Sequence, residues 1–197
     1  MAVGTAVAAA PVNDTLDHGQ SCLIITGAPG AGKSTVSLMV SQALVRSALL
    51  NGDQLNEMIV RGRVWALGEP ADEAARQVRL CNQNLCALAT NFADSGFTPV
   101  IDWIIPDRQQ LDFYLHTLSP RRVLVVVLAP SIDVCRRRNA TRDADEQFAF
   151  DGYEDLRSSM HDGFGTAGWW FDTSDLTPEE TAIQIVAEAP KRAARAL

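Results

Sequence analysis

Short runs of apolar and mostly β-branched residues alternate along the chain with longer segments of helical character. The short runs predict strands at residues 22–26, 48–52, 98–103, 122–128 and 168–172. The longer segments predict helices at residues 33–47, 53–61, 71–94, 107–117, 131–141, 151–162 and 178–194. This alternation is typical of an α/β fold with a parallel sheet. The run RVLVVVL at 122–128 has no polar alternation, so we expect a central strand that is covered on both faces.

The composition fits a globular protein and narrows the choice of partners. Of the 197 residues, 47% are hydrophobic and 21% are charged, which is ordinary for a folded domain. The formal net charge of -7 disfavours binding to nucleic acid, although it still allows a local basic groove. No apolar stretch is long enough for a membrane span, and residues 1–20 are interpreted as a flexible tail without the basic start of a secretory signal. These features favour a cytoplasmic protein.

The cysteines give no sign of a zinc site or a disulfide framework. Cys22, Cys81, Cys86 and Cys135 form no C-x-x-C pair, and no histidine lies at zinc-binding spacing from them. We therefore expect four reduced thiols that pack as small apolar side chains in the core.

The most specific signal is GAPGAGKST at residues 27–35, which follows an apolar run and precedes a predicted helix. Its first eight residues match the G-x-x-x-x-G-K-[ST] pattern of a P-loop, in which backbone N–H groups and a helix N-terminus bind phosphate oxygens. Lys33 is expected to reach the β- and γ-phosphates, Ser34 to bind Mg²⁺ and Thr35 to contact the α-phosphate. The predicted nucleotide contacts are Gly27, Ala28, Pro29, Gly30, Ala31, Gly32, Lys33, Ser34 and Thr35. The motif alone does not distinguish a phosphoryl donor from a hydrolysed fuel or a regulatory ligand.

Asp53 follows the predicted second strand, in the segment NGDQL. It therefore lies at a carboxyl end of the sheet, where open α/β sheets bind their ligands. A carboxylate at this place can accept the proton of a substrate hydroxyl as its oxygen attacks the γ-phosphorus. Aspartate is also a common N-cap of a following helix, and the pattern alone leaves both roles open.

Four segments in this order, GAPGAGKST, NGDQL, VIDW and RRRNATRD, resemble the 5′-kinase domain of polynucleotide kinase. The chain is also similar to smaller relatives, among them chloramphenicol phosphotransferase and the gluconate- and shikimate-kinase-like enzymes. The resemblance covers most of the chain from residue 21, and only the P-loop is specific by itself. It implies the three-layer P-loop NTPase fold of nucleoside-kinase-like proteins, an α/β fold with a five-stranded parallel sheet in the order 2-3-1-4-5. The kinase domain would cover residues 21–197 and carry a short helical lid around residues 136–150.

The resemblance also implies roles in catalysis. Asp53 would be the general base, and Lys33 would act on the transferred phosphate. The lid arginine that closes over the donor phosphates corresponds to Arg138, and Arg142 on the same helix face is the second choice. The alternative for this segment is a solvated basic helix face, which we favour for Arg136.

Two further positions follow from the same resemblance. Asp102, at the end of the strand in VIDW, would lie beside the metal and the P-loop and, with Ser34, would contribute to the metal site, either through water or directly. A strand-end cap is the alternative for this aspartate. The segment WWFDTSDLTPEE resembles the adenine-side loop of these kinases, so backbone groups near Thr173 and Asp175 would contact the base.

One position departs from the pattern of polynucleotide kinase. That pattern has a basic residue three positions after the catalytic aspartate, where it binds the acceptor phosphate, and here the position is Asn56. A neutral amide cannot replace a guanidinium in this role, so the acceptor is expected to lack a phosphate. The segment DADEQFAFDGYEDL at 143–156 is either a solvated connection or a wall for a neutral or cationic hydroxyl compound.

Together these residues predict an ATP- and Mg²⁺-dependent phosphotransferase that moves the γ-phosphoryl group to a hydroxyl of a small molecule, such as an antibiotic or a sugar-like metabolite. One alternative is a polynucleotide or nucleotide 5′-hydroxyl kinase, and an alternative of another class is an ATP-binding regulatory module. The pairing of Asp53 with the lid arginines favours a kinase over a binding module. The sequence identifies neither the acceptor nor the oligomeric state.

Overall fold

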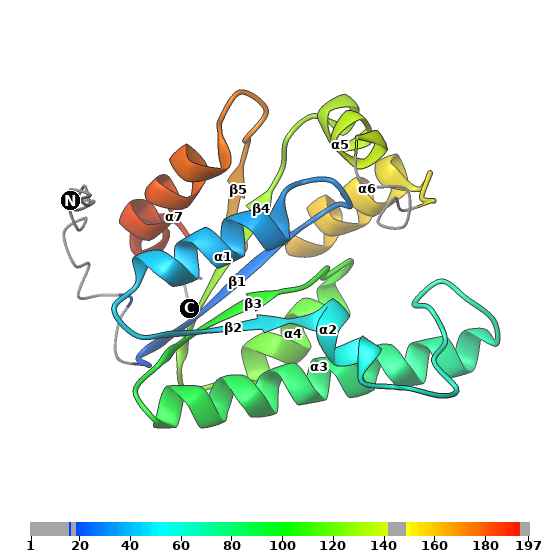
Figure 1. Cartoon of the computed structure of the whole chain (residues 1–197), viewed down its shortest axis with the longest axis horizontal. Helices are drawn as coiled ribbons and strands as arrows, with labels where there is room; N and C mark the ends of the chain where they lie inside the picture. The colour runs from blue at the N-terminus through cyan, green and yellow to red at the C-terminus, as the bar shows by residue number, and fades with distance from the viewer. Residues whose placement is uncertain (1–15, 17–18, 142–148, 194–197) are drawn as a thin grey trace, which may run out of the picture.

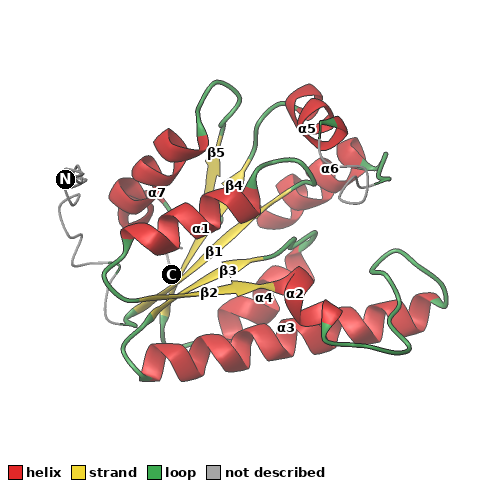
Figure 2. Cartoon of the chain, in the orientation of Figure 1, coloured by secondary structure: helices red, strands yellow, loops and turns green. Residues whose placement is uncertain are grey.

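The computed structural model describes Leu16, residues 19–141 and residues 149–193, and these form three layers (Figure 1). A five-stranded parallel sheet lies between helices on its two faces (Figure 2). The strands are β1 (Ser21–Gly27), β2 (Ser47–Asn51), β3 (Thr98–Asp102), β4 (Arg122–Leu128) and β5 (Trp169–Phe171). Their order is β2-β3-β1-β4-β5, which confirms the predicted order and the P-loop NTPase fold.

All of the predicted helices are present, and the first two end several residues earlier than predicted. The helices are α1 (Lys33–Ala43), α2 (Gly52–Glu57), α3 (Ala71–Asp94), α4 (Arg108–Thr117), α5 (Ile132–Ala140), α6 (Tyr153–Phe164) and α7 (Pro178–Arg192). The prediction that the first helix reaches residue 47 is wrong, because the backbone is extended at Leu44 and enters β2 at Ser47. The second helix ends before residue 61, because the N–H groups of Met58 and Ile59 close its last turn with shorter-range bonds to Leu55 and Asn56.

The interior strands place their side chains alternately on the two faces of the sheet. On β1, Leu23 and Ile25 join the core on one face, while Cys22 and Ile24 join the core on the other. β4 pairs with β1 along its whole length and is buried from Val123 to its end. The run without polar alternation is therefore an interior strand, as predicted.

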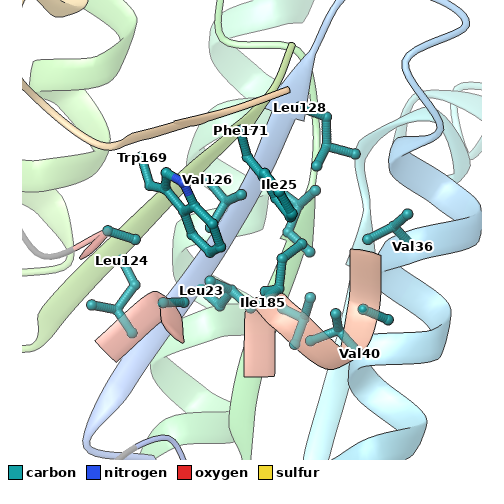
Figure 3. Close-up of a cluster of buried hydrophobic side chains, with 14 of the residues drawn as sticks. Leu23, Ile25, Val36, Val40, Leu124, Val126, Leu128, Trp169, Phe171 and Ile185 are labelled. Carbon is teal, nitrogen blue, oxygen red and sulfur yellow. The ribbon is translucent and has the colours of Figure 1, made fainter. Parts of the chain in front are cut away.

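One face of the sheet packs against α1 and α7. Figure 3 shows Leu23 and Ile25 of β1 beside Val36 and Val40 of α1 and Ile185 of α7. The opposite face packs against α3, α4 and α6 through a second set of buried side chains, including Leu85, Leu111 and Phe164. Within the described ranges, no helix is long and apolar enough to cross a membrane.

Leu16 lies in the segment that the sequence indicates as a flexible tail, and its side chain is buried in the core beside α1 and α7. Its carbonyl oxygen accepts a hydrogen bond from the hydroxyl of Thr98 at the start of β3. The other residues before Gly19 lie outside the described part of the chain.

The four cysteines are buried and form no disulfide, as predicted. Cys22, Cys81 and Cys86 pack in the core beneath α3 and α4, and Cys135 packs in the core on the other face. Burial raises the pKa of the Cys81 thiol to about 12, and the charge of Asp53 raises it further. Burial also raises the pKa of Cys86 to about 12. These thiols are therefore neutral and inert in the folded protein.

We expect a disulfide reagent to label less than about one thiol per native molecule at about pH 8, because the thiolate form is suppressed and buried. In denaturant all four cysteines should react. The measurement is absorbance of the released thiolate, with the unfolded protein as its own control. Rapid labelling of Cys81 in the native protein would contradict the described packing.

Candidate active site

The P-loop connects the carboxyl end of β1 to the start of α1 (Figure 1). Gly30 within it has a φ of 75°, a conformation that L side chains rarely adopt. A Cβ at Gly30 would lie 2.2 Å from the carbonyl oxygen of Cys135 in α5. Glycine is therefore required at this position both by the turn and by the close approach of the α5 backbone.

The functional groups of the P-loop lie at the N-terminus of α1. Lys33 is half-buried, and its Nζ donates a hydrogen bond of 3.2 Å to the carbonyl of Ala28 within the loop. Ser34 and Thr35 are exposed in the first turn, which contains no acidic residue. Gly32 caps the helix without a side-chain hydrogen bond. Because the N-terminus of a helix carries partial positive charge, this arrangement can bind phosphate.

A cavity of about 220 Å³ adjoins one side of the P-loop, and it is formed by the loop, the start of α1, Arg138 of α5 and the segment between β5 and α7. The guanidinium of Arg138 donates to the carbonyl of Ala31 at 3.4 Å and to the carbonyl of Thr173 at 3.3 Å. Arg138 thus connects the P-loop to the segment after β5. The structure brings the predicted residues Gly30, Thr35 and Arg138 together with Thr173 around one cavity.

Several predicted nucleotide contacts that the structure describes do not line this cavity, namely Gly27, Ala28, Pro29, Lys33, Ser34 and Asp175. Asp175 is exposed in the segment between β5 and α7 and does not line it. Arg142 lies outside the described residues. Arg136, which the sequence indicated as solvated, forms a bidentate ion pair with Glu154 of α6, at 2.9 and 3.0 Å. This pair joins α5 to α6 on the surface.

Asn51 and Asp102 form the polar centre at the ends of β2 and β3. Asp102 is only 2% exposed, and its Oδ2 accepts a hydrogen bond of 2.7 Å from Nδ2 of Asn51. Asp102 lies in register with Ile25 of β1, directly beside the strand that leads into the P-loop. The buried carboxylate of Asp102 therefore accepts a hydrogen bond from Asn51 at the end of the sheet where the P-loop begins.

The capping role that the sequence left open for Asp53 is played by Asn51. Oδ1 of Asn51 accepts a 2.9 Å hydrogen bond from the backbone N–H of Gln54, which defines Asn51 as the N-cap of α2. Asp53 lies in the first turn of α2 with an exposed side chain. Its carboxylate is thus not needed as a cap. Asn51 itself was missed, although an asparagine directly before a helix is a recognised cap signal.

The indole of Trp103 packs against the backbone of Gly52, the first residue of α2. A Cβ at Gly52 would lie 2.1 Å from Cε3 of Trp103, so only glycine allows the indole to pack against this backbone. The resemblance gives no role to Trp103. Its packing could not be found from sequence because Gly52 and Trp103 are far apart along the chain and meet only through the pairing of β2 with β3.

A larger cavity of about 480 Å³ lies on the other side of the P-loop. Its lining comes from Pro29 of the P-loop, the loop between α2 and α3, the segment after β3, and α6 with the residues before it. Phe150, in the segment interpreted as either a solvated connection or a substrate wall, lines this cavity. Trp65 and Trp103 line it as well and were missed.

The oxygen atoms near the P-loop suit a hard cation. Among the described residues no group of three or more His, Cys, Asp or Glu side chains could hold a metal ion. Mg²⁺ commonly uses one or two protein oxygens and completes its shell with phosphates and water. The hydroxyl of Ser34 and the carboxylate of Asp102 are oxygen ligands of this kind, so the predicted donor set fits Mg²⁺.

A family model described as an AAA domain matches residues 23–165 of the chain. The chain belongs to this family. The AAA-domain match extends from β1 to the end of α6, so it contains the P-loop, Asp53, Asp102 and Arg138. It ends before the segment that carries Thr173. No match was found among curated protein sequences.

Several solved structures share the fold of this AAA-domain chain. An unliganded sugar kinase from Janibacter sp. HTCC2649 has a TM-score of 0.61 at 16% identity, over 85% of this chain and 92% of that one. Shikimate kinase from Acinetobacter baumannii, solved with shikimate, has a TM-score of 0.60 at 18% identity, over 84% and 90%. The tunicamycin resistance protein of Deinococcus radiodurans has a TM-score of 0.58 at 20% identity, over 85% and 95%. The likeness confirms the predicted P-loop kinase fold.

We expect Asn51→Ala to lower the free energy of unfolding by roughly 2–4 kcal/mol, because it removes the cap of α2 and leaves the buried carboxylate of Asp102 without its donor. Thr177→Ala is the matched control, since it removes only the cap of α7 and should cost about 1 kcal/mol. Urea unfolding followed by circular dichroism measures both values. Equal losses in the two variants would show that the contact with Asp102 contributes nothing.

Proposed function

We propose that the protein is an ATP- and Mg²⁺-dependent phosphotransferase that phosphorylates a hydroxyl of a small molecule. The observation that carries the proposal is the place of the P-loop between two cavities. One is lined by Gly30, Gly32 and Arg138, and the other begins at Pro29. A nucleotide on the first side and an acceptor on the second would meet at the loop that binds the transferred phosphate. The sugar kinase and the shikimate kinase that share this fold support a small acceptor.

In this proposal the side chains around the P-loop orient the two substrates and stabilise the charge of the transferred phosphate. ATP would supply the γ-phosphoryl group and Mg²⁺ would neutralise phosphate charge, with Ser34 and Asp102 as the oxygen ligands on the protein. Lys33 and Arg138 supply positive charge beside the P-loop, where the transferring group gains negative charge. The exposed carboxylate of Asp53 accepts the proton of the acceptor hydroxyl.

The sequence-based alternatives remain distinguishable from this proposal. A 5′-hydroxyl kinase for nucleic acid would need a cation near Asn56 for the acceptor phosphate, and the overall charge of -7 repels a polyanion. A regulatory module would bind ATP without transferring its phosphate. Residues 21–197 are proposed to form the kinase domain.

The test is a screen of purified protein with ATP and Mg²⁺ against hydroxyl-bearing antibiotics, sugars and a 5′-hydroxyl oligonucleotide. ADP release and the mass of the product identify the phosphorylated compound. We expect transfer to a small molecule, and we expect Lys33→Ala to lower turnover by at least about 100-fold, since it removes a charge matched to the transferring phosphate. Preferred labelling of the oligonucleotide, or ATP binding without any transfer, would contradict the proposal.

The role of Asp53 has its own test. Asp53→Asn keeps the size of the side chain but removes its ability to accept a proton, so turnover should fall by roughly 100- to 10,000-fold while ATP affinity stays within a few-fold. Since Asn51 is the cap of α2, the melting temperature should hardly change. Steady-state kinetics, nucleotide titration and thermal unfolding measure the three quantities. A variant that unfolds earlier but keeps its rate would show that Asp53 is structural.

A further inference from the structure

The larger cavity has a chemical character that the proposed function does not specify. Its lining includes the side chains of Trp65, Leu67, Trp103 and Phe150, which give it apolar and aromatic walls. Asp155 is the one charged residue in that lining among the described parts of the chain. A ligand in this cavity therefore meets aromatic surface and a negative charge, and none of the described lining residues is a cation.

Trp65 and Leu67 expose more of their apolar surface to solvent than a core side chain does. Trp65 is 46% exposed and Leu67 is 67% exposed, although both are large and apolar. They lie together in the loop between α2 and α3, at the same end of the sheet as the P-loop and α6 (Figure 1). Neighbouring apolar side chains that remain exposed beside a cavity are typical of a binding surface.

The loop that carries Trp65 is held in place by Gln77 of α3. The Oε1 of Gln77 accepts a 2.8 Å hydrogen bond from the N–H of Val64, and its Nε2 donates to the carbonyl of Gly62 at 2.7 Å. The N–H of Gly68 donates to the carbonyl of Trp65 at 2.8 Å. Gln77 is itself only 8% exposed. The wall is therefore fixed before any ligand binds, which reduces the entropy lost on binding.

We propose that this cavity is the acceptor site and that it selects a neutral or cationic alcohol with a flat apolar body. The inference rests on the proposed function and adds the class of the acceptor. The hydroxyl would lie at the Pro29 end, beside the P-loop, and the apolar body would lie between Trp65 and Phe150. A carboxylate or phosphate on the acceptor would lose its hydration beside Asp155 without gaining a cation from the described lining residues, so anionic acceptors are disfavoured.

Three naphthyl probes of similar shape test the selectivity by isothermal titration calorimetry in the absence of ATP. Naphthylethanol is neutral, naphthylalaninol carries an ammonium group and naphthyllactate carries a carboxylate. We expect the ammonium probe and the neutral probe to bind, and the carboxylate probe to bind at least about tenfold more weakly. Glucose serves as a polar alcohol and should show no binding in the same range.

Matched variants assign the binding to the cavity. Trp65→Ala should weaken naphthylethanol by roughly 3- to 10-fold, because it removes an aromatic contact, while Ile183→Ala removes an exposed apolar side chain on α7 and should change nothing. Asp155→Asn should weaken only naphthylalaninol, by about 2- to 5-fold, because Asp155 is exposed and its charge is screened. Asp162→Asn, on the same helix but outside this cavity, is its control.

The outcomes separate this inference from the proposed function. Equal binding of the acid probe, or binding unaffected by Trp65→Ala, overturns the acceptor class even if ATP-dependent transfer to another compound is found. Efficient transfer to an anionic or a purely polar acceptor overturns it as well. Binding of the probes with the expected dependence on Trp65 and Asp155 supports the selectivity of the cavity, and it does so even if no phosphoryl transfer is detected and the proposed function fails.

Discussion

The close approach of the P-loop to α5 is the constraint on which the site depends. Gly30 leaves no space for a Cβ, because the carbonyl of Cys135 would lie 2.2 Å from it. Arg138 lies one helical turn beyond Cys135, so the same contact places its guanidinium over the mouth of the loop. A helix that stood further away would not bring the guanidinium of Arg138 to the carbonyl of Ala31 in the P-loop. The backbone contact therefore sets the geometry of the charges.

The two cavities beside the P-loop differ in the chemistry that they offer. The smaller one is built from backbone groups, a helix N-terminus and Arg138, which suits phosphates. The larger one is built from aromatic side chains and Asp155, which suits an uncharged or cationic compound. The P-loop contributes Gly30 to the smaller cavity and Pro29 to the larger one. The positive charge of Arg138 lies on the side of the smaller cavity. Such a separation would keep a polyphosphate from binding where the acceptor belongs.

Asn51 connects the sheet to the helix that carries the proposed base. One side-chain amide caps α2 and also donates to the buried carboxylate of Asp102. Asn51 thus contacts Asp102, which the resemblance assigned to the metal, and caps the helix whose first turn contains Asp53, which it assigned to proton transfer. The indole of Trp103 also packs against Gly52, at the point where β2 leads into α2. The position of Asp53 therefore follows from contacts at the ends of two strands.

The sequence by itself determined the order of strands and helices and the P-loop, because hydrophobic periodicity and the glycines of a tight turn are local signals. The full strand order came with the resemblance. Only the tertiary structure decided that Asn51 caps α2, and that Arg138 reaches the carbonyls of Ala31 and Thr173. Of the larger cavity, the sequence predicted only the wall that contains Phe150, as one of two alternatives for its segment. The walls of this cavity come from the P-loop, the loop before α3, α3 itself, the segment from the end of β3 into α4, and α6 with the residues before it. No local pattern encodes which side chains of such separate segments will meet.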